Sequence, residues 1–384
     1  MTLFRALARK PAEMTIPLRV PVCLLAALVL AGCQAPAPST STNPTPSRPP
    51  SPPAVRAFTT CFTAAPATWA GTQRASLPTT QLDVQAVTPA GDRAFASYLT
   101  VAGEQGIAAI DLATGALTRV VTSGGGASLA VDPPWLAWVR PASAANPDAW
   151  TLEARNLDTG EQLTVATPTP DAMGQPGVVL RAGRVAWVQP TTKGGQPRRA
   201  EVRVYDLATR SQTILDSGDV GSPFLAGRYL LWGHAGDGLR AVDGTTLQAA
   251  DLPARVRSQV SQSSGGSAAG SPEYLVWTGD EHAFAWRIDR DQLSTYAITD
   301  LNNRLQFLTV AGHYLIWFTS NQYAVLDLDT GGGYDFALPG SITGSDAAIV
   351  RTTSLGGSPK GAGPGTVVSV LPTASAPAIP ACGG

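Results

Sequence analysis

The amino-acid sequence predicts an all-β fold, a β-propeller of four-stranded antiparallel blades, and three observations support this. The 384 residues include 39 Gly and 32 Pro while only 14% are charged, a composition that favours many short strands and turns over long helices. A short apolar segment that ends in Trp recurs along the chain, and a turn-forming segment follows it. Their spacing indicates seven blades, with six as the alternative if the first or last unit is degenerate.

The recurring apolar segment predicts one strand in every blade. Its clear copies end at Trp138, Trp187, Trp232, Trp277 and Trp317, and weaker copies end at Tyr98 and Val350. The steps between these residues are 40, 49, 45, 45, 40 and 33, close to the roughly 40 to 50 residues of a four-stranded blade. Because both alternating faces of the segment are apolar, both must be buried, as they are between packed blades. We therefore expect the Trp and Tyr side chains to be core residues; a platform for stacking sugars is the alternative.

A turn motif rich in Asp, Thr and Gly follows every copy of this strand except the last. It is found at Asp111–Gly115, Asn156–Gly160, Asp206–Thr209, Asp243–Thr245, Asp289–Asp291 and Asp327–Gly331. These residues tighten a hairpin through side-chain to backbone hydrogen bonds and positive φ angles. We interpret them as turn residues rather than calcium ligands, because a calcium site needs more oxygen ligands than one Asp-x-Asp provides. The sequence predicts no metal site and no cofactor.

The first 32 residues predict an export signal, because basic residues precede an apolar run, Val20–Leu30, that is too short to span a bilayer. The run ends in Leu30-Ala31-Gly32-Cys33, which resembles the lipobox of bacterial lipoproteins. That resemblance implies that Cys33 is lipidated, that it is the first residue of the mature chain, and that a lipid anchor holds the protein at an extracytoplasmic face of the bacterial cell envelope. A secreted protein cleaved near Ala31 is the alternative.

Charge argues against a nucleic-acid partner. The formal net charge of the whole chain is -1, and residues 1–32 hold four basic residues and one acidic residue, so the mature chain carries -4. Residues 33–55 follow as a tether, rich in Pro, Ser, Thr and Ala, that cannot form a core and extends at roughly 3 Å per residue. Residues 56–384 are left for the propeller.

The strand and the hairpin together resemble the TolB-like β-propeller repeats of exported bacterial proteins, over roughly residues 76–371. TolB itself has an N-terminal α/β domain, for which there is no room between Val55 and Ser76, so binding to Tol partners is not implied. Quinoprotein repeats place Trp after the hairpin rather than before it, and the Gly-His and Trp-Asp pairs of WD40 repeats are missing.

Only two cysteines remain in the exported domain, since Cys23 leaves with the signal and Cys33 is lipidated. Cys61 and Cys382 lie at the two ends of that domain, and in an oxidising compartment such a pair predicts a disulfide, with two free thiols as the alternative. The seventh unit lacks a clear fourth strand, and the segment 56–62 has no partner of its own. We expect this N-terminal segment to close the ring as the outer strand of the last blade, with the disulfide locking the first and last blades together.

Binding residues are expected on the ring face that carries the longer loops, around the central channel. These loops are predicted at residues 140–148, 190–199, 254–270 and 280–282. Candidate residues for an anionic ligand are Lys193, Arg198 and Arg199. Asp280, Glu281 and His282 form the one cluster that a metal ion or a general base could use, although both groups fit solvated loops as well.

Two functions are open. The chain lacks a Gly-x-Ser-x-Gly motif, a His pair for zinc and a phosphate loop, which favours a non-catalytic scaffold for an envelope protein, a peptide or a glycan. The alternative is a hydrolase or lyase that acts on polysaccharide or peptide, with Asp219, Asp280 and Glu281 as candidate acids at the channel rim.

Overall fold

The computed structural model describes residues 54–77, 81–100, 102–143, 146–168, 174–191, 199–262, 267–279, 281–298, 307–318, 323–336, 341–355 and 365–382. The chain divides into two units, Met1–Ser51 and Pro52–Gly384, and all described residues belong to the second. The predicted signal, Cys33 and nearly all of the tether lie outside the described residues. Among those that are described, no helix is long and apolar enough to cross a membrane.

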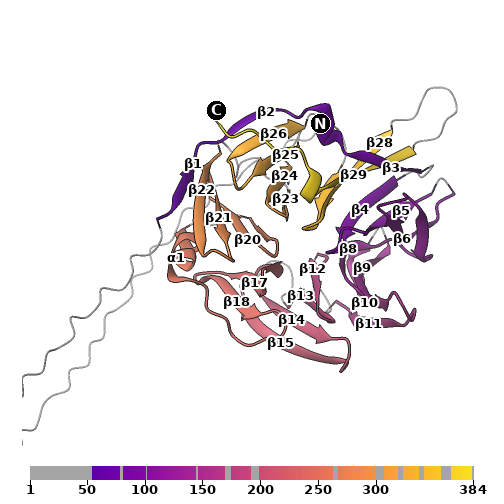
Figure 1. The fold of residues 1–384 in the computed structure, drawn as a ribbon. Helices are drawn as coiled ribbons and strands as arrows, with labels where there is room; N and C mark the ends of the chain where they lie inside the picture. The colour runs from indigo at the N-terminus through magenta and orange to yellow at the C-terminus, as the bar shows by residue number, and fades with distance from the viewer. Residues whose placement is uncertain are drawn as a thin grey trace, which may run out of the picture. The chain divides into compact units, whose positions relative to one another are not determined.

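Seven antiparallel sheets follow one another around a ring, which confirms the seven-bladed propeller and excludes the six-bladed alternative (Figure 1). Blade 1 contains β4 (Gln81–Val87), β5 (Arg93–Leu99), β6 (Gln105–Asp111) and β7 (Leu117–Val121). Blade 2 contains β8 (Ala127–Asp132), β9 (Trp135–Ser143), β10 (Asn146–Asn156) and β11 (Gln162–Ala166). Blade 3 contains β12 (Val178–Arg181), β13 (Arg184–Pro190), β14 (Ala200–Asp206) and β15 (Ser211–Gly218).

Blades 4 to 7 complete the ring. Blade 4 contains β16 (Phe224–Ala226), β17 (Tyr229–His234) and β18 (Gly238–Asp243), followed by the helix α1 (Ala254–Gln262). Blade 5 contains β19 (Ala268–Gly270), β20 (Tyr274–Thr278), β21 (His282–Arg287) and β22 (Gln292–Ala297). Blade 6 contains β23 (Phe307–Ala311), β24 (Tyr314–Phe318), β25 (Tyr323–Asp327) and β26 (Gly332–Phe336). Blade 7 contains β27 (Ser341–Gly344), β28 (Ala348–Leu355), β29 (Gly365–Pro372) and the N-terminal β3 (Thr72–Leu77).

The recurring Trp segment forms the second strand of each blade, as the sequence predicts. The Trp residues that end the recurring segment are at most 4% exposed, and they are Trp138 in β9, Trp187 in β13, Trp232 in β17, Trp277 in β20 and Trp317 in β24. Each packs with apolar side chains in the clusters that fill the interior. These residues are therefore core, and the sugar-platform alternative does not hold for them.

Three blades depart from four strands. Blade 4 has only three, because after a single bridge between Val242 and Ala249 the chain leaves the sheet for α1. Blades 5 and 6 have five, because β1 (Arg56–Phe58) pairs in parallel with β22 and β2 (Cys61–Ala64) pairs in parallel with β26.

The ring closes through a different segment from the one predicted. Residues 56–62 do not complete blade 7; they form the added strands β1 and β2 on blades 5 and 6. The outer strand of blade 7 is β3, which pairs antiparallel with β29 after the short 3-10 helix η1 (Ala67–Ala70). Gly71 turns the chain between them at φ +73°, where a Cβ would lie 2.9 Å from the Val370 carbonyl oxygen. Residues 56–70 thus form a strap along the outer edges of blades 5 and 6 (Figure 1).

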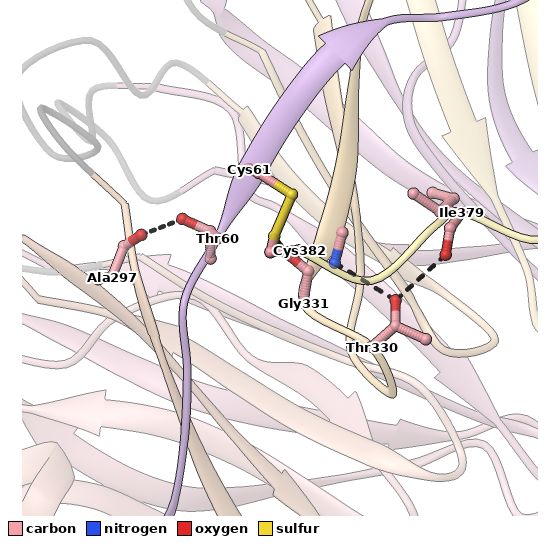
Figure 2. Close-up of a disulfide and its surroundings, with 8 residues drawn as sticks. Thr60, Cys61, Ala297, Thr330, Gly331, Ile379 and Cys382 are labelled. Atoms are coloured by element: carbon pink, nitrogen blue, oxygen red, sulfur yellow. Dashed lines mark hydrogen bonds between the residues drawn. A yellow bond between two sulfur atoms is a disulfide. The ribbon is translucent and has the colours of Figure 1, made fainter. Parts of the chain in front are cut away.

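The predicted disulfide between Cys61 and Cys382 is confirmed, with a Cα–Cα distance of 5.6 Å. It joins β2 to the C-terminal segment that follows the 3-10 helix η2 (Thr373–Ser375). Figure 2 shows a hydrogen bond on each side of the disulfide. On one side the Thr60 hydroxyl donates to the Ala297 carbonyl, and on the other the Thr330 hydroxyl accepts from the Gly332 amide. The disulfide therefore fastens the strap and the C-terminal segment beside blade 6, rather than locking blades 1 and 7 together.

Two of the predicted long loops contain regular structure. In the segment 140–148, β9 runs to Ser143 and β10 begins at Asn146, so most of it belongs to a hairpin. The segment 254–270 contains the helix α1, whose Val256 is fully buried and packs against apolar side chains of blades 4 and 5. Polarity misled the prediction in both cases, because an outer hairpin and a surface helix expose most of their side chains to water.

Candidate functional site

The turn motif builds one face of the ring in the way that the sequence predicts. This turn face carries the turns between the first and second strands and those between the third and fourth strands of each blade. The side chains of Asp111, Asn156, Asp206 and Asp243 each accept hydrogen bonds from the amides two and three residues later. Each motif also ties the two turns of its blade together, as where the Leu328 amide donates to the His313 carbonyl over 3.0 Å. The result is a hydrogen-bonded, rigid platform.

Arg287 gathers three carboxylates on this face, between blades 5 and 6. Its guanidinium lies 3.4 Å from Glu273, 3.1 Å from Asp289 and 2.9 Å from Asp329. The Tyr274 hydroxyl donates to the same Asp329 oxygen over 2.8 Å. Burial raises the pKa of Tyr274, and Asp329 raises it further, so this hydroxyl stays a donor at neutral pH.

His313, Asp327 and Asp329 form an adjoining cluster in which one ligand atom from each residue lies within 4.8 Å of the others. Burial raises the pKa of Asp327, whereas the backbone amide of Asp329 and the nearby His313 lower it. An imidazole and two carboxylates are ligand types that divalent metals accept. However, Arg287 and Tyr274 already donate to Asp329, and the guanidinium charge opposes a metal ion. The cluster is therefore satisfied within the protein as a hydrogen-bonded ionic network.

Asp346 is a further acidic residue on the same face. It lies in the first turn of blade 7, and burial raises its pKa to about 6. Glu273 from blade 5 raises this pKa as well, while Arg181 from blade 3 lowers it. The charges that act on Asp346 therefore come from two other blades of the ring. One carboxylate oxygen of Asp346, Oδ1, is buried without a hydrogen-bond partner.

Only some of the residues predicted from the loops are described, and those lie at the ends of strands opposite the turn face. Arg199 is exposed and its carbonyl accepts from the Thr191 amide over 2.9 Å. Glu281 and His282 are exposed at the start of β21, and the Glu281 carbonyl accepts from the Ile298 amide over 3.0 Å. Lys193, Arg198 and Asp280 lie outside the described residues. A ligand site formed by these residues stays a prediction.

The acidic residues of the turn face were not recognised as a site from the sequence. The sequence predicts Asp327 and Asp329 as turn residues, and the structure gives them that role together with a second one in the ionic network. Glu273, Arg287 and Asp346 have no shared motif, because Glu273 and Asp346 come from the first turns of blades 5 and 7 and Arg287 ends strand β21. Charged residues at equivalent turn positions of neighbouring repeat units were the signal that could have identified them.

The sequence matches no family model and no curated protein. Solved structures similar to this chain are β-propeller proteins of different activities. They include oligogalacturonate lyase from Vibrio parahaemolyticus, at 11% identity and a TM-score of 0.49 over 78% of this chain and 93% of that one. The β-propeller domain of the Trilobed protease from Pyrococcus furiosus matches at 9% identity and 0.43, over 71% and 90%. BamB from Moraxella catarrhalis matches at 16% and 0.40, over 74% and 83%.

Proposed function

We propose that this protein is a lipid-anchored, extracytoplasmic lipoprotein of the bacterial cell envelope whose propeller binds a cationic segment of a protein partner on its turn face. The signal and the Leu30–Cys33 motif support the anchor. The fold supports a binding role, because a propeller is a rigid scaffold that presents its turns on one surface.

The observation that carries the binding role is the concentration of carboxylates around blades 5, 6 and 7 of the turn face. Glu273, Asp289, Asp327, Asp329 and Asp346 outnumber the guanidinium groups Arg181, Arg287 and Arg290 that act on them. Two of these carboxyls have raised pKa values because burial removes water from their charged forms. A Lys or Arg side chain of a partner would supply the missing positive charge, which is the complementarity that steers and orients protein association.

The anchor is tested by replacing the residue that would carry the lipid. In the full chain expressed in a diderm bacterium, we expect Cys33→Ser to move the protein from the membrane fraction to the soluble fraction, because a covalent acyl chain supplies about 0.8 kcal/mol per buried CH₂ group. Cys23→Ser is the matched control and should leave the distribution unchanged. Recovery of the Cys33→Ser protein with membranes after a carbonate wash would count against the anchor.

The binding site is tested with a lysine-rich peptide as the probe, titrated calorimetrically against the full chain. Asp346→Asn and Asp289→Asn are each expected to raise the Kd for the peptide about 3- to 10-fold at pH 7.5. Asp251→Asn is the control and should leave the Kd unchanged, because the Asp251 side chain is 96% exposed and forms its ion pair with Arg257, away from the turn face. Below about pH 6 the carboxyl of Asp346 is protonated and loses its charge, so wild-type binding should weaken as the pH falls through about 6. The Asp346→Asn variant should lose most of that pH dependence.

Two results would contradict this proposal. Equal affinity of the probe for wild type and for both turn-face variants would remove the acidic surface as the binding site. Turnover of a polysaccharide or peptide that Asp346→Asn abolishes would favour the hydrolase or lyase alternative, with the carboxyls of Asp346 and Glu273 as the candidate acid and base.

A further inference from the structure

Blade 2 carries an arginine at a repeat position that is apolar or aromatic in the other blades with the turn motif. In those blades, the residue directly before the motif packs against the preceding blade. These residues are Ile110, Tyr205, Val242, Ile288 and Leu326. In blade 2 this residue is Arg155, which is half-buried. Arg155 is paired across the sheet with Leu136, whose side chain packs against blade 1, so the two side chains share the face that adjoins blade 1.

A groove lies between blades 1 and 2 at the end of the strands that carries the turn motif. Arg93 and Asp111 of blade 1 line it, together with Arg155 of blade 2. Apolar side chains also line it, among them the half-buried Val120 of blade 1 and Leu157 of blade 2. The groove therefore combines guanidinium groups from two blades with an apolar surface.

Arg93 is not held by the acidic residue opposite it. In blade 3 the equivalent cross-strand pair, Arg184 and Asp206, forms an ion pair at 3.2 Å. Arg93 and Asp111 are paired across the strands of blade 1 in the same way, but Arg93 forms its ion pair with Asp92, at 3.7 Å between side chains that are more than half exposed. Such exposed pairs contribute little to stability, so Arg93 can turn to a ligand at small cost.

The guanidinium of Arg155 is also available. Within the part of the chain that the structure describes, the Arg155 side chain forms no ion pair and no hydrogen bond. The Asp111 carboxylate serves its own turn, where Oδ1 accepts from two backbone amides. Arg119, a third basic residue beside the groove, is paired with Glu104 at 3.1 Å. Arg93 and Arg155 are thus the two groups that can bind a ligand.

We propose that this groove binds an organic anion, a carboxylate joined to an apolar body. Arg93 and Arg155 hold the carboxylate, while Val120 and Leu157 contact the apolar body. A guanidinium presents parallel N–H groups that match the two oxygens of a carboxylate. The apolar surface favours such a ligand over an inorganic anion, because only the organic ligand removes apolar area from water when it binds. The site is separate from the acidic surface of blades 5, 6 and 7.

Calorimetric titration of the full chain with sodium octanoate tests this site. The Kd for octanoate is expected to rise about 10-fold in Arg155→Leu, because the carboxylate loses one of its two charged donors. The variant should fold, since Leu326 occupies the equivalent position of blade 6. Asp111→Asn should instead lower the Kd about 2- to 5-fold, by removing a negative charge beside the ligand. This variant should keep its turn, because Asn156 accepts the same two amide hydrogen bonds in blade 2.

Arg184→Gln is the matched control, because Arg184 has the position of Arg93 in blade 3 and is already paired with Asp206. It should leave the Kd for octanoate unchanged. Sodium phosphate, at the same pH and ionic strength, should bind more weakly than octanoate because it has no apolar body. The proposal would be overturned if octanoate did not bind, if its Kd were the same in Arg155→Leu, or if its Kd rose in Asp111→Asn. Phosphate binding as tightly as octanoate would refute the ligand class.

Discussion

Replacing Cys61 and Cys382 together with Ser is expected to lower the free energy of unfolding by about 4 kcal/mol. The bond closes a loop with a sequence separation of 321 residues, so its loss releases nearly the whole domain in the unfolded state. The native contacts beside the bond, such as the Thr60 hydroxyl on the Ala297 carbonyl, remain (Figure 2). The fold should survive at 25 °C with a lower midpoint of denaturation, because the blades keep their own cores.

Chemical denaturation of the propeller in the context of the full chain measures this effect. The wild type treated with a reductant provides the control, since it should lose as much stability as the double variant, while the reductant should not affect the variant. A double variant that is as stable as the wild type would mean that the strap and the C-terminal segment are fixed without the covalent bond.

The repeat units were predictable because their signal is local. A strand that is buried on both faces must be apolar at consecutive positions, and the Asp-Thr-Gly turn needs its residue types within five positions, so both patterns survive in the sequence. All seven predicted copies, from Tyr98 to Val350, form second strands. The spacing favoured seven blades and left six open, and the seven sheets of the structure exclude six.

Ring closure was not predictable in the same way, because outer strands carry a weak signal. β3 reads TQRASL and its polar side chains suit an exposed edge, so it has no apolar pattern to identify it. The sequence favours the segment 56–62 as the closing strand because the seventh unit lacks a clear fourth strand and this segment has no partner of its own. In the structure, Phe58 and Phe62 of this segment pack against the core of blades 5 and 6 instead. Which of these two segments closes the ring depends on which blade has an unpaired outer strand edge, and only the assembled ring determines that.

The candidate site was missed for a related reason. The carboxylates of the turn face come from turns of blades 5, 6 and 7, and only the ring brings Glu273, Asp329 and Asp346 to one surface. Each one taken alone is typical of a solvated turn. The cysteine pair, in contrast, could be predicted by elimination among four cysteines, and the structure confirms the bond while placing it on blade 6.

Trp69 is expected to be the second large contributor to stability, and Trp69→Ala should cost about 3 to 5 kcal/mol. It is 3% exposed in η1, where no repeat motif predicted a core residue. Its ring contacts Tyr314 and Tyr334 edge to face with centroids 5.2 and 5.4 Å apart, and its Nε1 donates to the Pro377 carbonyl over 3.1 Å. One side chain therefore holds the strap, blade 6 and the C-terminal segment together.

Two further variants separate packing from hydrogen bonding at this position. Trp69→Phe keeps an aromatic ring against Tyr314 but removes the Nε1 donor, so it should lose less, about 1 to 2 kcal/mol in denaturation experiments. Trp135→Ala, at a half-buried Trp outside the strap, is the control for removing an indole and should also cost less than Trp69→Ala. If Trp69→Ala were no worse than Trp135→Ala, the strap would be held by strand pairing and the disulfide alone. The expected order follows from where the buried area lies, because η1 places this one large side chain in the apolar cluster shared by blades 6 and 7 before β3 closes the ring.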